Sequence, residues 1–475
     1  MLLPLPINLW TRYSAAHLLD RAGFGGTPDE IESLYEMGPE RAVSSLIQAA
    51  PDDDLFPPPQ GLVPGLRHVY NQRILTSTTD EEKKTLRKEV GKIEREQILA
   101  LRLWWLNRMR YTPSPLVEKT ALFWHGHFAT SIQKVNDPYL MWQQNETLRV
   151  MAMGKFPALL KAMSRDPAMI RWLDLEQSHR KHPNENFARE LMELFSLGEG
   201  HYTEKDVQEA ARAFTGYRFR PEDGKFHYVP SDFDNGEKSF MGTTGGLDGD
   251  QIIDLITSQP QCARFIGRKI WQYFVFDHPS EATLNEVTDL LLRNGYDIAA
   301  TLSVIFRSAA FYSPTVMHRQ IKGPVQWMIQ TTKMLEIPLP EAKVLENSLT
   351  YLGQVLFAPP NVKGWDGGRS WISASSLLYR YNLATYLLNG KAHVLGSDKY
   401  RQAMIPLGKI APSDQRSSPN ALLNPLAFRI FNAPIEQNEL KQYLSYLEKI
   451  PAPYSDNSVR DLMQIMMSTP SFQLN

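Results

Sequence analysis

The segment NENFARELME, residues 184–193, concentrates side chains that can transfer protons. Glu190 and Glu193 are three residues apart, so a helix would place both carboxyl groups on one face. Two carboxyl groups in different environments can have their pKa values driven apart, and such a pair supplies one acid and one base. We therefore predict that Glu190 and Glu193 are catalytic residues.

Ordinary helix stabilisation accounts for part of this polar density. Glu185, Arg189 and Glu193 are spaced by four residues, and ion pairs at this spacing contribute only about 0.2–0.5 kcal/mol each. The two asparagines of the segment could each cap the helix. Glu190 is the residue that these structural roles leave unexplained.

A metal centre is an alternative interpretation, in which His127 joins Glu190 and Glu193 as ligands. His125 and His127 would point the same way on a strand but diverge by about 200° on a helix. The apolar spacing of this segment favours a helix, so shared ligation by both histidines would require a break between them. No HExxH motif is present. We therefore predict no metal ligand and retain His127 as a third catalytic candidate, with a buried, hydrogen-bonded histidine as the structural alternative.

Polar and aromatic side chains elsewhere could hold a hydroxyl-rich or anionic substrate. Trp365 lies in a glycine-rich loop and could form a flat apolar platform for a sugar ring; alternatively, it fills the core beneath a turn. The candidate substrate-binding residues are Asn184, Glu185, Asn186, Arg189, Arg212, Lys238, Lys363 and Trp365.

Helical spacing of apolar residues dominates the chain, and no run of alternating strands is found. We therefore predict a mostly α fold, with one large multi-helical domain over residues 1–475 and a C-terminal helical subdomain at residues 394–475. The charged segment at residues 79–111 becomes apolar and aromatic at ILALRLWWLNRM, and its charged first part, residues 80–94, is predicted to be a solvated helix. Two irregular loop insertions, at about residues 218–249 and 357–371, are the obvious places for a site.

Composition restricts the possible partners. The 475 residues are 43% apolar and 22% charged with a net charge of −1, which gives no reason to expect a nucleic acid or an anionic membrane surface as partner. No run of about 18 apolar residues is present, so no membrane span is predicted. No signal peptide is evident, so a cytoplasmic location is expected, or a periplasmic or exported one if the chain has been trimmed.

Six motifs occur in order along the sequence. They are AAHLLDRAGFG, FWHGHFATS, NENFARELMELFSLGEGHYTEKDVQEAARAFTGY, FDNGEKSFMG, QCARFIGRKIWQYFV and PPNVKGWDGGRSWISASSLLYRYN. Together they resemble the bacterial family known as domain of unknown function 1800, from about residue 14 to the last residues of the sequence.

The resemblance implies a largely helical protein with a shared polar site whose reaction is not known. It also implies a partner, because genes of this family often neighbour those of a sulfatase- and alkaline-phosphatase-like family. This sequence departs from the common pattern at Phe195, where many relatives have a histidine, and in lacking an export signal. The positions that match residues kept in the family are His127, Asn184, Glu185, Asn186, Arg189, Glu190, Thr215, Gly216, Lys363, Gly364 and Trp365.

Three functions are compatible with these observations. The first is a hydrolase or transferase that uses carboxylate acid–base chemistry on a polar, glycan-like substrate. The second is a metal-dependent enzyme with His127 and Glu190 or Glu193 as ligands. The third is a non-catalytic protein that binds a sulfatase- or phosphatase-like partner. No particular cofactor is predicted.

Overall fold

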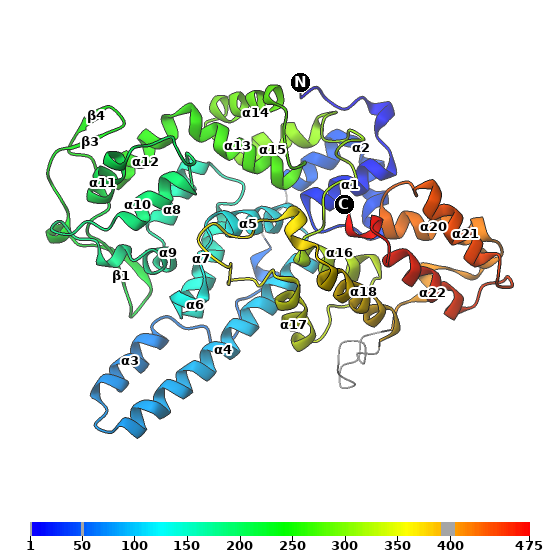
Figure 1. The fold of residues 1–475 in the computed structure, drawn as a ribbon, viewed down its shortest axis with the longest axis horizontal. Coiled ribbons are helices and arrows are strands. Elements are labelled where there is room, and N and C mark those ends of the chain that lie inside the picture. The colour runs from blue at the N-terminus through cyan, green and yellow to red at the C-terminus, as the bar shows by residue number, and fades with distance from the viewer. Residues whose placement is uncertain (1, 49–51, 391–403) are drawn as a thin grey trace.

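The computed structural model describes residues 2–48, 52–390 and 404–475, and helices dominate it (Figure 1). The mostly α fold predicted from the apolar spacing is therefore confirmed. The first helices are α1 (Arg12–Ala22), α2 (Pro28–Ile47, interrupted at Gly38), α3 (Leu66–Thr76), α4 (Asp80–Tyr111), α5 (Pro115–His127), α6 (Ile132–Val135), α7 (Pro138–Val150), α8 (Phe156–Ser164) and α9 (Pro167–Trp172).

Two short antiparallel hairpins interrupt the middle of the chain. In the first, Tyr217 lies opposite Tyr228, and in the second, Lys238 lies opposite Gly245. The elements of this part are α10 (Glu185–Glu193), α11 (Glu204–Ala213), β1 (Tyr217–Arg220), β2 (Lys225–Tyr228), β3 (Lys238–Phe240), β4 (Thr243–Gly245), α12 (Gly249–Ser258), α13 (Pro260–Phe274), α14 (Glu281–Arg293) and α15 (Ile298–Arg307). The hairpins occupy the first irregular segment predicted from the sequence.

The last part of the chain returns to helices after a second irregular segment. Residues 357–371 contain only a short 3-10 turn at Gly368–Trp371. The helices are α16 (Pro324–Met334), α17 (Ala342–Leu352), α18 (Ala374–Asn389), α19 (Leu407–Ile410), α20 (Pro419–Phe431), α21 (Gln437–Leu447) and α22 (Asp456–Met467). A C-terminal subdomain was predicted for residues 394–475, of which residues 394–403 lie outside the described residues. The buried side chains of α19 to α22 belong to the same apolar core as the rest of the molecule.

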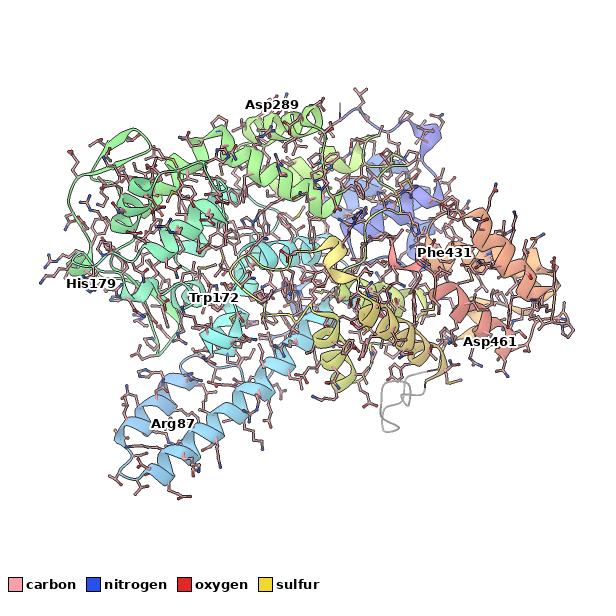
Figure 2. The ribbon with its side chains drawn as sticks, viewed as in Figure 1. Arg87, Trp172, His179, Asp289, Phe431 and Asp461 are labelled. Atoms are coloured by element: carbon pink, nitrogen blue, oxygen red, sulfur yellow. The ribbon has the colours of Figure 1, made fainter. Side chains whose placement is uncertain are left out.

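One continuous apolar core joins α1 to the C-terminal helices. A second, small cluster of Tyr70, Leu86 and Val90 holds α3 against the first half of α4. This helical pair projects from the body, and we call residues 66–96 the arm (Figure 1). Arg87 lies on it, well away from the body (Figure 2). The arm confirms the predicted solvated helix and carries a groove of about 530 Å³, lined by Arg67, Asn71, Ile74, Leu75, Arg87, Val90, Gly91 and Glu94.

None of the helices in the described ranges combines the length and apolar character that crossing a membrane requires.

The α5 helix carries a fully buried carboxylate, Glu118, in its first half. Its Oε1 accepts hydrogen bonds from Arg108 Nε at 2.7 Å and Arg149 Nε at 2.5 Å, and its Oε2 accepts one from Trp105 Nε1 at 2.7 Å. A carboxylate can be buried at tolerable cost only when opposite charges and donors surround it. This network therefore fixes α5 against α4 and α7.

A second group of buried charges joins α1 and α5 to the late helices. Asp20 Oδ1 accepts hydrogen bonds from Gln330 Nε2 at 2.9 Å and Asn432 Nδ2 at 3.2 Å. Burial raises the pKa of Asp20 to about 6. Burial, together with the nearby charge of Arg21, lowers the pKa of Lys119 to about 7. The centre of the molecule is thus held by polar groups as well as by apolar packing.

Candidate functional site

Two asparagines fix the start of α10. Asn184 is the N-cap: its Oδ1 accepts a hydrogen bond from Asn186 N at 2.9 Å. The Asn184 side chain also donates to the carbonyl of Asp174 at 3.1 Å, and that of Asn186 donates to the carbonyl of Leu173 at 3.2 Å. The structure therefore gives both side chains positioning contacts that hold α10 to the preceding turn.

Beyond this cap, α10 buries one face and leaves its carboxylates on the other. Phe187 and Leu191 are buried. Glu190 is half-buried, and burial, followed by the nearby charge of Glu193, raises its pKa. Its side chain forms no hydrogen bond or ion pair within the residues that the structure describes. Glu193 instead accepts a hydrogen bond from the hydroxyl of Tyr202 at 2.6 Å. The two carboxyl groups thus have different surroundings.

Arg189 and Glu185 take part in surface ion pairs. The Arg189 guanidinium lies 2.7 Å from the carboxylate of Glu204 and 3.3 Å from that of Glu185. The hydrogen bond to Glu204 raises the pKa of Arg189. This is the i,i+4 stabilisation expected from the spacing, with an added pair to α11.

The α5 helix continues through His127, as its apolar spacing predicted, and its two histidines diverge. His125 Nε2 accepts a hydrogen bond from Phe357 N at 3.0 Å. His127 Nε2 lies 3.0 Å from the carbonyl of Phe195, so this nitrogen carries the proton and donates. Burial lowers the pKa of His125 to about 3 and that of His127 well below its usual value. Both rings are therefore neutral.

The remaining nitrogen of His127 faces a residue that the sequence did not single out, Lys269 on α13. Lys269 Nζ lies 3.1 Å from His127 Nδ1 and 3.1 Å from the carbonyl of Leu194. It also lies 4.7 Å from the centre of the Phe265 ring. Burial, and then the charge of Lys363, lowers the pKa of Lys269 to about 8.

The Lys269 contact was not predictable because it joins residues that are far apart in sequence. Lys269 lies beside Ile270, which belongs to the buried apolar stripe of α13. A charged residue at the border of such a stripe was the one available signal, and it does not identify a partner.

The Lys-Gly-Trp loop packs on the last turn of α5. At Gly364, whose φ is +88°, an added Cβ would lie 2.3 Å from the carbonyl oxygen of Gly126. The Trp365 ring lies 5.6 Å from that of His125 and is partly exposed. Lys363 is exposed and forms an ion pair with Asp366 at 3.1 Å. The structure thus places this loop beside His127 and brings Lys363 within electrostatic reach of Lys269.

Arg212 and Lys238 have other partners. The Arg212 guanidinium lies 2.7 Å from the carboxylate of Asp234 and 2.8 Å from that of Glu209. Lys238 is buried, and its Nζ donates to the carbonyls of Asp234 at 2.6 Å and Gly236 at 3.1 Å. These contacts fasten the segment between the two hairpins to α11. Neither cation forms an ion pair with a carboxylate of α10 in the described residues.

The residues of the metal alternative can be placed in this geometry. Across residues 2–48, 52–390 and 404–475, no group of three His, Cys, Asp or Glu side chains is arranged so that it could hold a metal ion. Both ring nitrogens of His127 already have partners, Phe195 and Lys269. To bind a metal ion, His127 would have to break its contact with either Phe195 or Lys269.

Groups with shifted pKa values therefore gather along α10 and at its C-terminal end. Glu190 has its pKa raised, Lys269 has its pKa lowered, and His127 is neutral between Lys269 and the helix terminus. Such clusters are typical of functional sites, although structural networks also produce them. Acid–base chemistry near neutral pH is what this arrangement can supply.

Comparison with known proteins identifies a family and no characterised relative. The profile of the family described as "Protein of unknown function (DUF1800)" matches residues 17–474. No curated protein and no solved structure matches the chain. Because that match covers nearly the whole sequence, the chain belongs to the DUF1800 family.

Proposed function

We propose that this protein is a hydrolase or transferase that uses carboxylate acid–base chemistry on a polar, glycan-like substrate. One observation carries the proposal: Glu190 is half-buried, has a raised pKa and has no hydrogen-bond partner within the described residues, whereas Glu193 on the same face is bound by Tyr202. This is the asymmetry that separates an acid from a base in a carboxyl pair.

The roles follow from these surroundings. A raised pKa keeps more of Glu190 protonated near neutral pH, so it can donate its proton to the oxygen of a leaving group. Glu193 would accept the proton of the attacking water or hydroxyl while Tyr202 orients its carboxylate. His127 has both ring nitrogens occupied, so we assign it the role of positioning Lys269.

The test is the substitution Glu190→Gln, assayed on a panel of 4-nitrophenyl glycosides and esters. The amide keeps the shape of the side chain but cannot donate an acidic proton, so we expect a loss of turnover of about 10²-fold or more. Glu185→Gln is the matched control, because that residue lies on the same helix in a surface ion pair. Turnover that persists in Glu190→Gln, per folded molecule, would show that the assignment is wrong.

Binding to a partner protein is a second candidate, and the arm favours it. Ile74, Leu75 and Val90 line its groove together with Arg87 and with Arg67, whose guanidinium is paired with Glu94 at 2.6 Å. A complementary partner surface would carry apolar and acidic side chains. We propose the sulfatase- and alkaline-phosphatase-like protein implied by the family resemblance as the occupant.

Co-purification with that protein tests the second candidate. Leu75 is 76% exposed at the groove, so Leu75→Glu should abolish the complex without affecting folding. Leu378→Glu, at a 61% exposed leucine on α18, is the matched control and should leave the complex intact. Equal complex formation by both variants would contradict the use of the groove.

A further inference from the structure

We propose that Lys269 and Lys363 form a binding site for an anionic group of the substrate, at the C-terminal end of α10. The group is an oxyanion: a carboxylate, phosphate or sulfate carried by the polar substrate. This inference rests on the proposed function, since it specifies the substrate class of the same site.

The first observation is the geometry of the Lys269 ammonium group. A lysine ammonium has three N–H donors. Two of them have partners in the structure, His127 Nδ1 and the Leu194 carbonyl, each at 3.1 Å. Both partners are neutral, and together they orient the side chain. The third has no hydrogen-bond acceptor among the described residues, and the ammonium group otherwise contacts the Phe265 ring, whose centre lies 4.7 Å from Nζ.

The second observation is that Lys269 has no acidic partner. Among the residues that the structure describes, it forms no ion pair with Asp or Glu. Lys333, a buried lysine on α16, has such a partner, since its Nζ lies 3.2 Å from the carboxylate of Glu30, whereas the buried Lys238 donates to carbonyls as Lys269 does. A largely buried cation without a counterion is costly. An anionic ligand would supply the missing charge.

The third observation is a second cation next to the first. Gly364 packs directly on the carbonyl of Gly126, the residue before His127, and this holds the backbone of the adjacent Lys363 beside the last turn of α5. The charge of Lys363 acts unfavourably on Lys269. Two like charges held together in this way are relieved when an anion binds between them.

The ion pair of Lys363 with Asp366 does not prevent such binding. Both side chains are highly exposed, 71% and 70%, and exposed pairs contribute about 0–1 kcal/mol. A substrate oxyanion can replace Asp366 at little cost. Lys363 is therefore available to approach a ligand already held by Lys269.

A purely structural role for Lys269 makes a different prediction. Lysine side chains often bind the last carbonyls of a helix, where they also interact favourably with its dipole. The contact with Leu194 is of this kind. A purely structural role of Lys269 does not involve Lys363. If anion binding depends on Lys363, the anion site is favoured over the structural role.

The experiment is calorimetric titration of the full-length protein with inorganic phosphate, sulfate and glucuronate at constant ionic strength. We expect saturable binding of at least one probe, and the three probes distinguish phosphate, sulfate and carboxylate as the preferred group. Lys363→Met should weaken binding by about fivefold or more, as expected when a charge near a bound anion is removed. Lys269→Met should weaken it further, and Lys269→Arg should retain part of it.

Lys343→Met is the matched control. Lys343, on α17, forms an i,i+3 ion pair with Glu346 at 3.0 Å, the same spacing as the pair of Lys363 with Asp366 in the loop. Its removal should leave affinity unchanged. Absence of saturable binding, or equal affinity in Lys363→Met and Lys343→Met, would overturn the proposal. Because Lys363 is exposed, this comparison holds even if Lys269→Met fails to fold.

Failure of this inference is separable from failure of the proposed function. Glu190→Gln should bind the anion as the unmodified protein does, because Glu190 has no contact with either lysine in the described residues. Retained turnover in Glu190→Gln contradicts the catalytic assignment alone, and unchanged anion affinity in Lys363→Met contradicts the anion site alone.

Discussion

Glu118 and Glu190 are both helical glutamates, yet their surroundings differ. Glu118 is 1% exposed and accepts hydrogen bonds from Trp105, Arg108 and Arg149. Glu190 is half-buried and has no such partner in the part of the chain that the structure describes. Glu118 is removed from water and receives donors in compensation, whereas Glu190 is partly exposed and has no protein donor in the described residues.

The difference separates structural charges from reactive ones. A carboxylate whose oxygens are all engaged cannot exchange a proton without breaking the packing that depends on it. A carboxyl group with a raised pKa and a free side chain can bind and release a proton without that disruption. A high density of charged residues therefore does not identify the candidate site. The carboxyl group that lacks a hydrogen-bond or ion-pair partner in the described residues does.

Substitution of Glu118 should have the largest effect on stability. Glu118→Gln removes the buried charge that Arg108 and Arg149 share, leaving Arg108 with Asp52 and Arg149 with Glu146, and breaking a buried charge network costs up to about 3–5 kcal/mol. Urea unfolding followed by circular dichroism measures this. Glu185→Gln, in a surface pair, should change stability by less than about 0.5 kcal/mol. Similar losses in both variants would remove the distinction drawn between the two environments.

The buried amine of Lys119 should make stability depend on alkaline pH. Its pKa falls from 10.5 to about 7 on folding, first because of burial and then because of Arg21, while Asp20 opposes the change. Between these values the unfolded chain binds the extra proton, so stability rises with pH, by up to about 1.4 kcal/mol per pH unit for one proton.

The variant Lys119→Met isolates this contribution. The difference in unfolding free energy between the unmodified protein and Lys119→Met should increase from pH 7 to 10. The difference in unfolding free energy between the unmodified protein and Lys343→Met, a variant of an exposed lysine, should not change over this pH range. A flat difference for Lys119 would mean that this amine remains charged inside the protein.

Two glycines of the same loop test how closely it must approach α5. Gly364 and Gly367 both have positive φ, +88° and +75°, and Gly367, with a ψ of −171°, lies in a region that essentially only glycine adopts, so alanine at either position is strained by about 1–3 kcal/mol. Only at Gly364 would the new Cβ meet backbone, the Gly126 carbonyl at 2.3 Å. We expect Gly364→Ala to lower the melting temperature more than Gly367→Ala and to weaken phosphate binding. Equal effects would mean that the loop does not depend on this contact.

Glu190 should show the smallest effect on stability. Glu190→Gln is expected to change the unfolding free energy by about 0.5 kcal/mol or less at neutral pH, because no partner is lost. Since the folded-state pKa lies above the unfolded value of 4.5, the unmodified protein loses stability as pH rises through this range. Relative to Glu190→Gln it should therefore be less stable at pH 7 than at pH 4. A pH-independent difference would indicate an ordinary solvated carboxylate.

Local features of this protein were predictable, because local residues determine them. The α10 helix, its asparagine cap and the two irregular segments follow from capping residues and apolar spacing. The contact between Lys269 and His127 joins residues 142 positions apart, and no local pattern contains it. The sequence thus predicted the helix of the candidate site but did not identify Lys269.

The hydrogen bonds of Asp20 have a consequence for biosynthesis. Their partners, Gln330 and Asn432, lie 310 and 412 residues later in the chain. At a synthesis rate of about 5–20 residues per second, Asn432 is made roughly 20–80 s after Asp20. Through that interval the first helix lacks the amide groups that donate hydrogen bonds to its interior carboxylate. The N-terminal helix therefore completes its buried hydrogen bonds only after nearly the whole described chain has been synthesised.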